Sequence, residues 1–327
     1  MKKKLILGIC TLSAAAMLCG FDSAETADSI LEKVTENTAS IESMTSDIGF
    51  NCDVAVNVGD GTTTSSIAVL ITADFDMQAT LDPVAFMMDG GLTMSTFGQS
   101  EDITLKMYAI NNDDTLDTYV YTEDSAYDEE GEGTWEYDSS DDFDIQSLLE
   151  YSETLNIGDL SDWGITFELA SEAADYEGTE CYLLTSVIDT TTLTTVLEKA
   201  EELAGEELTD DDDISTALAL LDGLKLSIEY YIDTTSYLPV AMHMDLNDSD
   251  LSVLNSYIGE MMLDLSEEDD STTVELILND VSLDFTFSYD DIVSITVPEE
   301  ALAAADEEDE SEYEDITDES GIQFVEG

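Results

Sequence analysis

The stretch Tyr231–Leu246, YIDTTSYLPVAMHMDL, carries the pattern that decides the fold. Two alternating apolar runs flank a five-residue polar turn, and this arrangement predicts an antiparallel β-hairpin. Successive side chains of a strand point to opposite faces. Met242 and Met244 share the parity of Val240, whereas His243, the only histidine, has the opposite parity. The pattern therefore predicts that the methionines face a covered apolar side and that His243 faces solvent.

The same alternation continues along most of the chain and predicts one large antiparallel sheet. Residues 48–58 carry apolar side chains on even numbers, and residues 67–81 carry them on odd numbers. One apolar face and one polar face are typical of an antiparallel sheet covered on one side. Further strands are predicted at 84–88, 91–97, 103–110, 118–121, 133–137, 165–170, 180–189, 224–232, 240–246, 273–278, 281–288 and 292–297.

Apolar residues spaced by three and four predict amphipathic helices at 26–44, 143–155, 191–204, 215–221 and 251–263. No flexible linker divides the chain, so we expect a single α+β domain over residues 25–300, with helices on one face of the sheet. The acidic, low-complexity residues 303–327 predict a disordered tail.

The N-terminal residues 1–19 have the features of a signal peptide: three lysines, an apolar stretch and small residues near its end. Cys19, followed by Gly20, stands where a bacterial lipoprotein is cleaved and lipidated. Two alternatives follow, a lipid anchor at Cys19 or simple secretion. Either places the protein outside the cell or on the outer face of the cell membrane. In that oxidising compartment, Cys52 and Cys181 form either a disulfide or two buried free thiols.

Composition excludes several classes of function. The chain has 78 Asp and Glu, 7 Lys and no Arg, for a net charge of −71. No basic patch is available to neutralise phosphates, which excludes nucleic-acid binding and attraction to anionic membrane surfaces. The chain has one histidine and no closely spaced cysteine pair, so we expect no metal site. It has no catalytic or nucleotide-binding motif, so we expect no cofactor. We therefore expect a non-enzymatic, monomeric protein. A glycosidase using two carboxylates, with Trp135 and Trp163 as the available tryptophans, is the third alternative.

Several methionines share the parity of their apolar strand neighbours. Methionine is deformable, yet it is a weaker strand former than valine or isoleucine, so its repeated use on one face needs a reason. One interpretation is core filling beneath the helices. The other is a soft-walled cavity between sheet and helices that accepts an acyl chain or similar apolar group. The methionines concerned are Met77, Met88, Met94, Met107, Met242 and Met244.

The order of these elements resembles a known family. Cys19 after a signal peptide is followed by a helix ending in IESMTSDIGF (41–50) and by long alternating strands. YEGTECYLLTSVID (176–189) and LSIEYYIDTTSYLPVAMHMDL (226–246) come later. Over residues 25–300 this pattern resembles the LolA- and LprG/LppX-like bacterial lipoproteins, in particular a Gram-positive branch.

The resemblance implies a strongly curved antiparallel half-barrel whose concave face is packed with amphipathic helices. It implies no catalytic residues and a cavity that holds a hydrophobic or lipidic ligand. We therefore expect a secreted or surface-anchored binding protein; the alternative is a structural or sensory surface module with a fully packed core. The cavity lining implied for this chain is Phe50, Val54, Phe75, Met88, Met107, Ile228, Met242 and Met244.

Overall fold

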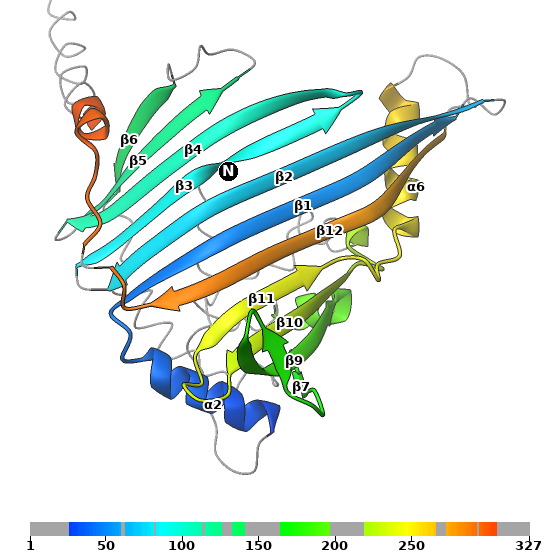
Figure 1. Ribbon diagram of the computed structural model, residues 1–327. Coiled ribbons are helices and arrows are strands. Elements are labelled where there is room, and N and C mark those ends of the chain that lie inside the picture. The colour runs from blue at the N-terminus through cyan, green and yellow to red at the C-terminus, as the bar shows by residue number, and fades with distance from the viewer. Residues whose placement is uncertain are drawn as a thin grey trace, which may run out of the picture.

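The fold is an open, curved antiparallel sheet of 12 strands with a few helices, as the sequence predicted (Figure 1). The computed structural model describes residues 26–59, 63–81, 83–112, 115–125, 133–140, 164–196, 219–265, 273–292 and 294–305. Along the sheet the strand order is β6-β5-β4-β3-β2-β1-β12-β11-β10-β9-β7, and β8 pairs with β9. Two meanders, one from each half of the chain, are therefore joined by the pairing of the first strand with the last.

The strands of the first meander are β1 (Ser43–Gly59), β2 (Thr64–Leu81), β3 (Val84–Thr96), β4 (Gln99–Asn112), β5 (Thr115–Asp124) and β6 (Thr134–Ser140). Those of the second are β7 (Glu168–Leu169), β8 (Ala174–Tyr176), β9 (Thr179–Asp189), β10 (Lys225–Asp233), β11 (Pro239–Asp245) and β12 (Thr273–Tyr289). The helices with full bounds are α2 (Ala27–Thr38) and α6 (Ser252–Leu265).

Strand register aligns the apolar residues of neighbouring strands into rows. One row runs from Ile48 of β1 through Phe285, Met242, Tyr230 and Leu184 on β12, β11, β10 and β9. We call the face that carries this row the inner face. The opposite, outer face carries the alternate residues of each strand.

Helix α2 packs on the inner face of the second meander. Thr26 and Ser29 form a capping box at its start, each side-chain oxygen accepting from the other's backbone N–H, at 3.2 and 2.9 Å. The apolar stripe that the sequence predicted, Ile30, Leu31 and Val34, is buried against β9–β12. This cluster is the core of the described structure.

The turn of the β10–β11 hairpin holds α2 in place. Lys33 Nζ donates to the Tyr237 hydroxyl at 3.0 Å and lies 4.2 Å from the centre of the Tyr237 ring. Asn37 Nδ2 donates to the carbonyl oxygen of Ser236 at 2.7 Å. The stretch Tyr231–Leu246 therefore supplies both the sheet under the helix and the polar contacts at its side.

Helix α6 covers part of the edge of β12. Strand β11 pairs with β12 only over residues 282–286, so within the described residues the start of β12 has no strand partner on that side. The side chain of Asn255 in α6 takes the place of a strand partner. Its Oδ1 accepts from the Leu276 N–H at 2.7 Å, and its Nδ2 donates to the Leu276 carbonyl at 3.2 Å. Covering such an edge protects unpaired backbone groups.

Several predicted boundaries were wrong. The strands expected at 84–88 and 91–97 form one continuous strand, β3 (Val84–Thr96), and those expected at 273–278 and 281–288 form β12 (Thr273–Tyr289). The first helix ends at Thr38 instead of continuing to Met44. Residues 292 and 294–297 are not in a strand, because Asp290, at φ 62°, turns the chain out of the sheet after β12. The signal peptide with Cys19, the helix at 143–155 and the acidic tail lie outside the described residues.

Candidate functional site

The eight residues expected to line a cavity share the inner face. Phe50 pairs with Leu283 of β12, which pairs with Met244 of β11, and Met244 pairs with Ile228 of β10. Met242 lies on β11 beside them, and the remaining four lie on the inner face of β1–β4, at Val54, Phe75, Met88 and Met107. The sheet therefore brings together, on one surface, positions up to 194 residues apart, from Phe50 to Met244.

Burial divides seven of these eight residues into two groups; the eighth, Met107 of β4, is 8% exposed but lies outside the cluster under α2. Ile228, Met242 and Met244 are each 8% exposed and belong to the cluster under α2, so they fill the core. Phe50, Val54, Phe75 and Met88 are half-buried, and the cluster around α2 includes no described residue of β2–β6. The apolar inner face thus extends well beyond the part that α2 covers.

Three methionines form a row across the first meander. Met77 of β2 pairs with Met88 of β3, and Met88 pairs with Met107 of β4. Met77 and Met107 are buried, and Met88 between them is half-buried. Three unbranched thioether side chains side by side form a wall that can change shape, because each has three rotatable bonds.

A glycine beside this row makes room for an aromatic ring. Gly90 of β3 pairs with Phe75 of β2. A Cβ at Gly90 would lie 2.6 Å from Cδ1 of Phe75 and 2.1 Å from the backbone oxygen of Asp74. The Phe75 ring therefore occupies the space that a side chain at Gly90 would fill, and it adds to the apolar surface.

Three buried hydroxyls interrupt the inner face. Within the described structure, Ser46 Oγ, Ser186 Oγ and the Tyr289 hydroxyl have no hydrogen-bond partner. Burial raises the pKa of Tyr289 far above its ordinary value. An unpaired buried hydroxyl costs roughly 1–3 kcal/mol, so each of these groups would gain from a polar partner.

His243 lies on the outer face, away from the apolar surface. It pairs with Glu229 and Asp284 in the sheet, and its Nδ1 is 2.6 Å from Asp284 Oδ1. Its Nε2 lies 3.8 Å from Asp245 Oδ2, and the side chain is 34% exposed. The sequence parity therefore placed the histidine and the two methionines on the correct faces.

Cys52 and Cys181 are free thiols, so the disulfide alternative is wrong for this structure. Strands β12, β11 and β10 separate β1 from β9, and each step across a sheet is about 4.8 Å. Their Cα atoms are therefore beyond the limit of about 7 Å for a disulfide. Burial raises the pKa of both thiols, with smaller contributions from Asp53 and Asp233.

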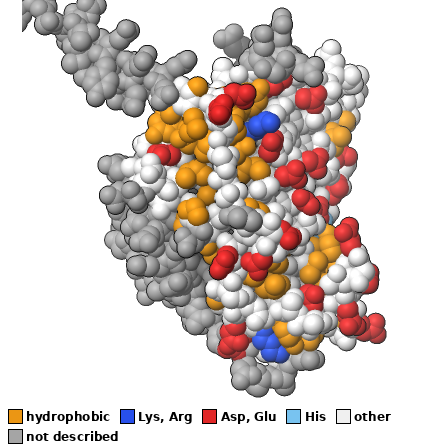
Figure 2. Space-filling view, turned by 60° about the vertical axis from the view of Figure 1, so that its left-hand side comes forward, with side chains coloured by type: hydrophobic (Ala, Val, Ile, Leu, Met, Phe, Trp, Pro, Cys, Tyr) orange, Lys and Arg blue, Asp and Glu red, His pale blue; other side chains and the backbone are white. Residues whose placement is uncertain are grey.

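Sequence reasoning missed a group of aromatic rings on the outer face of β4–β6. Figure 2 shows hydrophobic side chains gathered in this region, and carboxylates scattered among other side chains over the rest of the visible face. The group borders a pocket of about 560 Å³. The signal was present, because aromatic residues recur at every second position of adjacent strands with the parity opposite to the apolar face. These residues are Tyr108, Tyr119, Tyr121, Trp135 and Tyr137.

A second hollow on the outer face is strongly acidic. It measures about 440 Å³ and forms where Gly49 leaves the outer face without a side chain. Among the described residues, no group of His, Cys, Asp and Glu is arranged to hold a metal ion. None of the helices in the described ranges is both long enough and apolar enough to cross a membrane. The acids of the hollow are Asp47, Asp74, Asp76 and Asp89.

Comparison with known proteins gives distant matches. A family of unknown function (DUF6612) matches residues 26–135. No curated protein matches the chain.

Among solved structures, lipoprotein LppX of Mycobacterium tuberculosis is 14% identical, with 81% of this chain and 94% of LppX covered at a TM-score of 0.32. LprF from Mycobacterium bovis is 13% identical, with coverage of 81% and 92% and a TM-score of 0.30. A DUF1329 family protein from Desulfovibrio piger is 10% identical, with coverage of 79% and 90% and a TM-score of 0.20.

Proposed function

We propose that this protein binds a lipidic ligand on the inner face of β1–β4 and catalyses no reaction on it. The observation that carries the proposal is the apolar surface around Phe50, Phe75 and Met88, which continues past the α2 cluster and stays half-buried. Packed strands usually bury such side chains fully, so a half-buried continuous surface of this kind fits a ligand site.

The gain from binding an acyl chain here is large enough to be useful. Each methylene removed from water contributes about 0.8 kcal/mol, so ten methylenes contribute about 8 kcal/mol before the entropic cost of binding. The row formed by Met77, Met88 and Met107 suits chains of different length or unsaturation, because methionine side chains adapt to irregular contents.

The buried hydroxyls favour a ligand with a polar group at one end. Ser46 and Tyr289 occupy the two strands that join the meanders, β1 and β12, and lack partners in the described structure. A hydroxyl, ester or carboxyl group of an amphiphile could pair with them and remove the cost of leaving them unsatisfied.

We further propose that the chain works as a monomer outside the cell, held at the membrane by a lipid on Cys19. The residue follows an apolar segment with three lysines before it, as in bacterial lipoproteins. The net charge of −71 would keep the folded domain away from an anionic membrane surface, so the lipid would act as a tether.

The test uses a neutral fluorescent probe, N-phenyl-1-naphthylamine, with the full mature chain. Binding should raise probe fluorescence, and fatty acids should displace the probe. Met88→Gln puts an amide on the inner face and should weaken probe binding several-fold. Met87→Gln is the matched control. Met87 directly precedes Met88 in β3 and is also half-buried, but it faces the outer side.

Native mass spectrometry after gentle extraction separates this proposal from its alternative. Retained lipid in the wild-type chain, reduced in Met88→Gln, supports a ligand carrier. A clean ligand-free mass together with no probe binding would instead identify a structural or sensory module with a fully packed core.

A further inference from the structure

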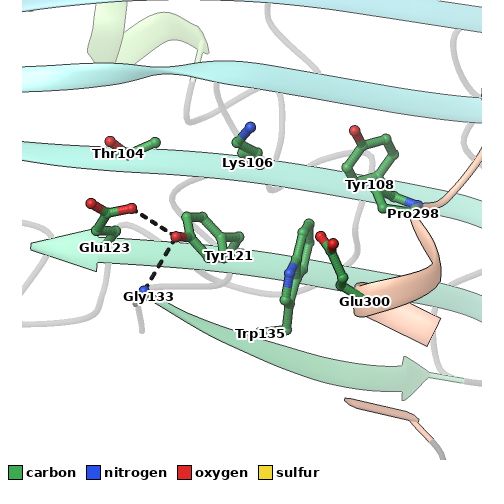
Figure 3. Close-up of a pocket in the computed structure, with 9 residues that line it drawn as sticks. All are labelled: Thr104, Lys106, Tyr108, Tyr121, Glu123, Gly133, Trp135, Pro298 and Glu300. Carbon is green, nitrogen blue, oxygen red and sulfur yellow. Dashed lines mark hydrogen bonds between the residues drawn. The ribbon is translucent and has the colours of Figure 1, made fainter. Parts of the chain in front are cut away.

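The pocket beside the aromatic rings of β4–β6 lies on the outer face, separate from the apolar inner face (Figure 3). We call it the outer pocket and define it by three rings, Tyr108, Tyr121 and Trp135, and two carboxylates, Glu123 and Glu300. The rings come from adjacent strands β4, β5 and β6, whereas Glu300 comes from the segment that follows β12.

The indole of Trp135 stands between the two tyrosines. Its centroid lies 5.3 Å from that of Tyr121, with 50° between the ring planes, and 6.1 Å from that of Tyr108, with 43° between the planes. In Figure 3 the carboxylate of Glu300 lies beside the indole. All three rings are half-buried, so part of each ring surface stays open to a ligand.

The Tyr121 ring is held firmly. Its hydroxyl donates to Glu123 Oε2 at 2.7 Å and accepts from the Gly133 N–H at 3.2 Å. A Cβ at Gly133 would lie 2.6 Å from Cζ of Tyr121, so glycine is required for the ring to lie where it does. These contacts orient one wall of the pocket before any ligand arrives, which lowers the cost of binding.

The charges of the outer pocket favour a positively charged ligand. The one cation among its lining residues, Lys106, forms an ion pair with Asp89 of β3 at 3.3 Å. That pair is neutral as a unit, so the carboxylates of Glu123 and Glu300 set the sign of the local charge. The net charge of −71 adds a negative field around the whole molecule, which attracts cations and repels anions.

We propose that the outer pocket binds a small organic cation, namely an alkylammonium or quaternary ammonium group. Aromatic faces attract such cations through their negative quadrupole, and tryptophan attracts them most strongly. Rings from three strands, two carboxylates and a rigid tyrosine together match the requirements of that ligand class. The site is independent of lipid binding, because the two faces of the sheet carry different residues.

The test measures the fluorescence of Trp135 during titration with choline chloride. Trp163→Phe removes the other tryptophan, so the signal comes from the outer pocket alone. Choline should quench or shift this fluorescence in a saturable way. Its neutral isostere 3,3-dimethylbutan-1-ol should bind much more weakly, and sodium chloride at equal ionic strength should have no effect. Equal binding of choline and the neutral isostere would overturn the proposal.

Charge variants locate the ligand. Glu300→Gln and Glu123→Gln should each weaken choline binding about fivefold, as expected for one charge about 4 Å away in water. Tyr108→Leu should weaken it about two- to thirtyfold. Glu229→Gln is the matched control, because Glu229 also accepts from a tyrosine hydroxyl, that of Tyr231 at 2.8 Å, but does not line the pocket. Unchanged affinity in both carboxylate variants would overturn the assignment.

Discussion

Replacing Ile30 by alanine should destabilise the protein more than a typical substitution. Ile30 is 0% exposed and lies at the centre of the α2 stripe, between the helix and strands β9–β12. Its side chain therefore leaves water completely on folding, and no solvent can fill the space that truncation creates.

The expected cost follows from the atoms removed. Ile30→Ala deletes three carbon atoms, and each buried methylene equivalent contributes about 0.8 kcal/mol, or about 2.4 kcal/mol in total. The residual cavity adds to this, because the surrounding structure relaxes only in part, and buried isoleucine truncations cost roughly 2–5 kcal/mol. We expect a loss of about 3–4 kcal/mol in the free energy of unfolding.

Urea denaturation followed by circular dichroism measures this loss. With a slope of about 3 kcal/mol per molar urea, the midpoint should fall by about 1 M. Glu36→Ala on the exposed side of the same helix is the control and should change stability by less than about 0.5 kcal/mol. A loss below about 1 kcal/mol for Ile30→Ala would refute the packing of α2 on the second meander.

Three further predictions concern the sheet edge, the acidic hollow and the N-terminus. Asn255→Ala removes both hydrogen bonds to the backbone of Leu276, and urea denaturation should show a loss of about 1–3 kcal/mol. Burial and the Asp47 carboxylate raise the pKa of Asp76, so its charged form destabilises the fold as pH rises through that pKa. Asp76→Asn should therefore raise the melting temperature at pH 7, and the gain should shrink as the pH falls through the raised pKa toward about 4; an equal gain at pH 7 and at about pH 4 would contradict this. Cys19→Ala should release the protein into the medium, and membrane association that persists in cell fractionation would exclude a lipid there.

The sequence identified the face of each side chain better than the ends of the elements. Parity alone placed Phe50, Phe75 and Met88 with Met242, and it separated them from His243. Boundaries were less accurate, because a strand ends where its partners end. The turn at Asp290, whose N–H donates to the Ser43 carbonyl, is set by a residue far away in the chain and ended a predicted strand.

The two candidate sites differ in the same way, because one could be predicted from the sequence and the other could not. The inner face needed only period-two alternation, and its residues were named from the sequence. The outer pocket needed three strands in register and a segment from beyond β12, and Glu300 is more than 160 residues from Trp135. No local pattern links such positions.

The sequence by itself determined that the chain forms an antiparallel sheet with one apolar face and one acidic face. This is because alternation is a property of the extended backbone and acts over two residues. Only the tertiary structure decided that β1 pairs with β12, that α2 covers just one meander, and that Cys52 and Cys181 lie apart. Those outcomes depend on which surfaces meet after the chain has folded, and the free energy of that packing is shared among residues from both ends of the sequence.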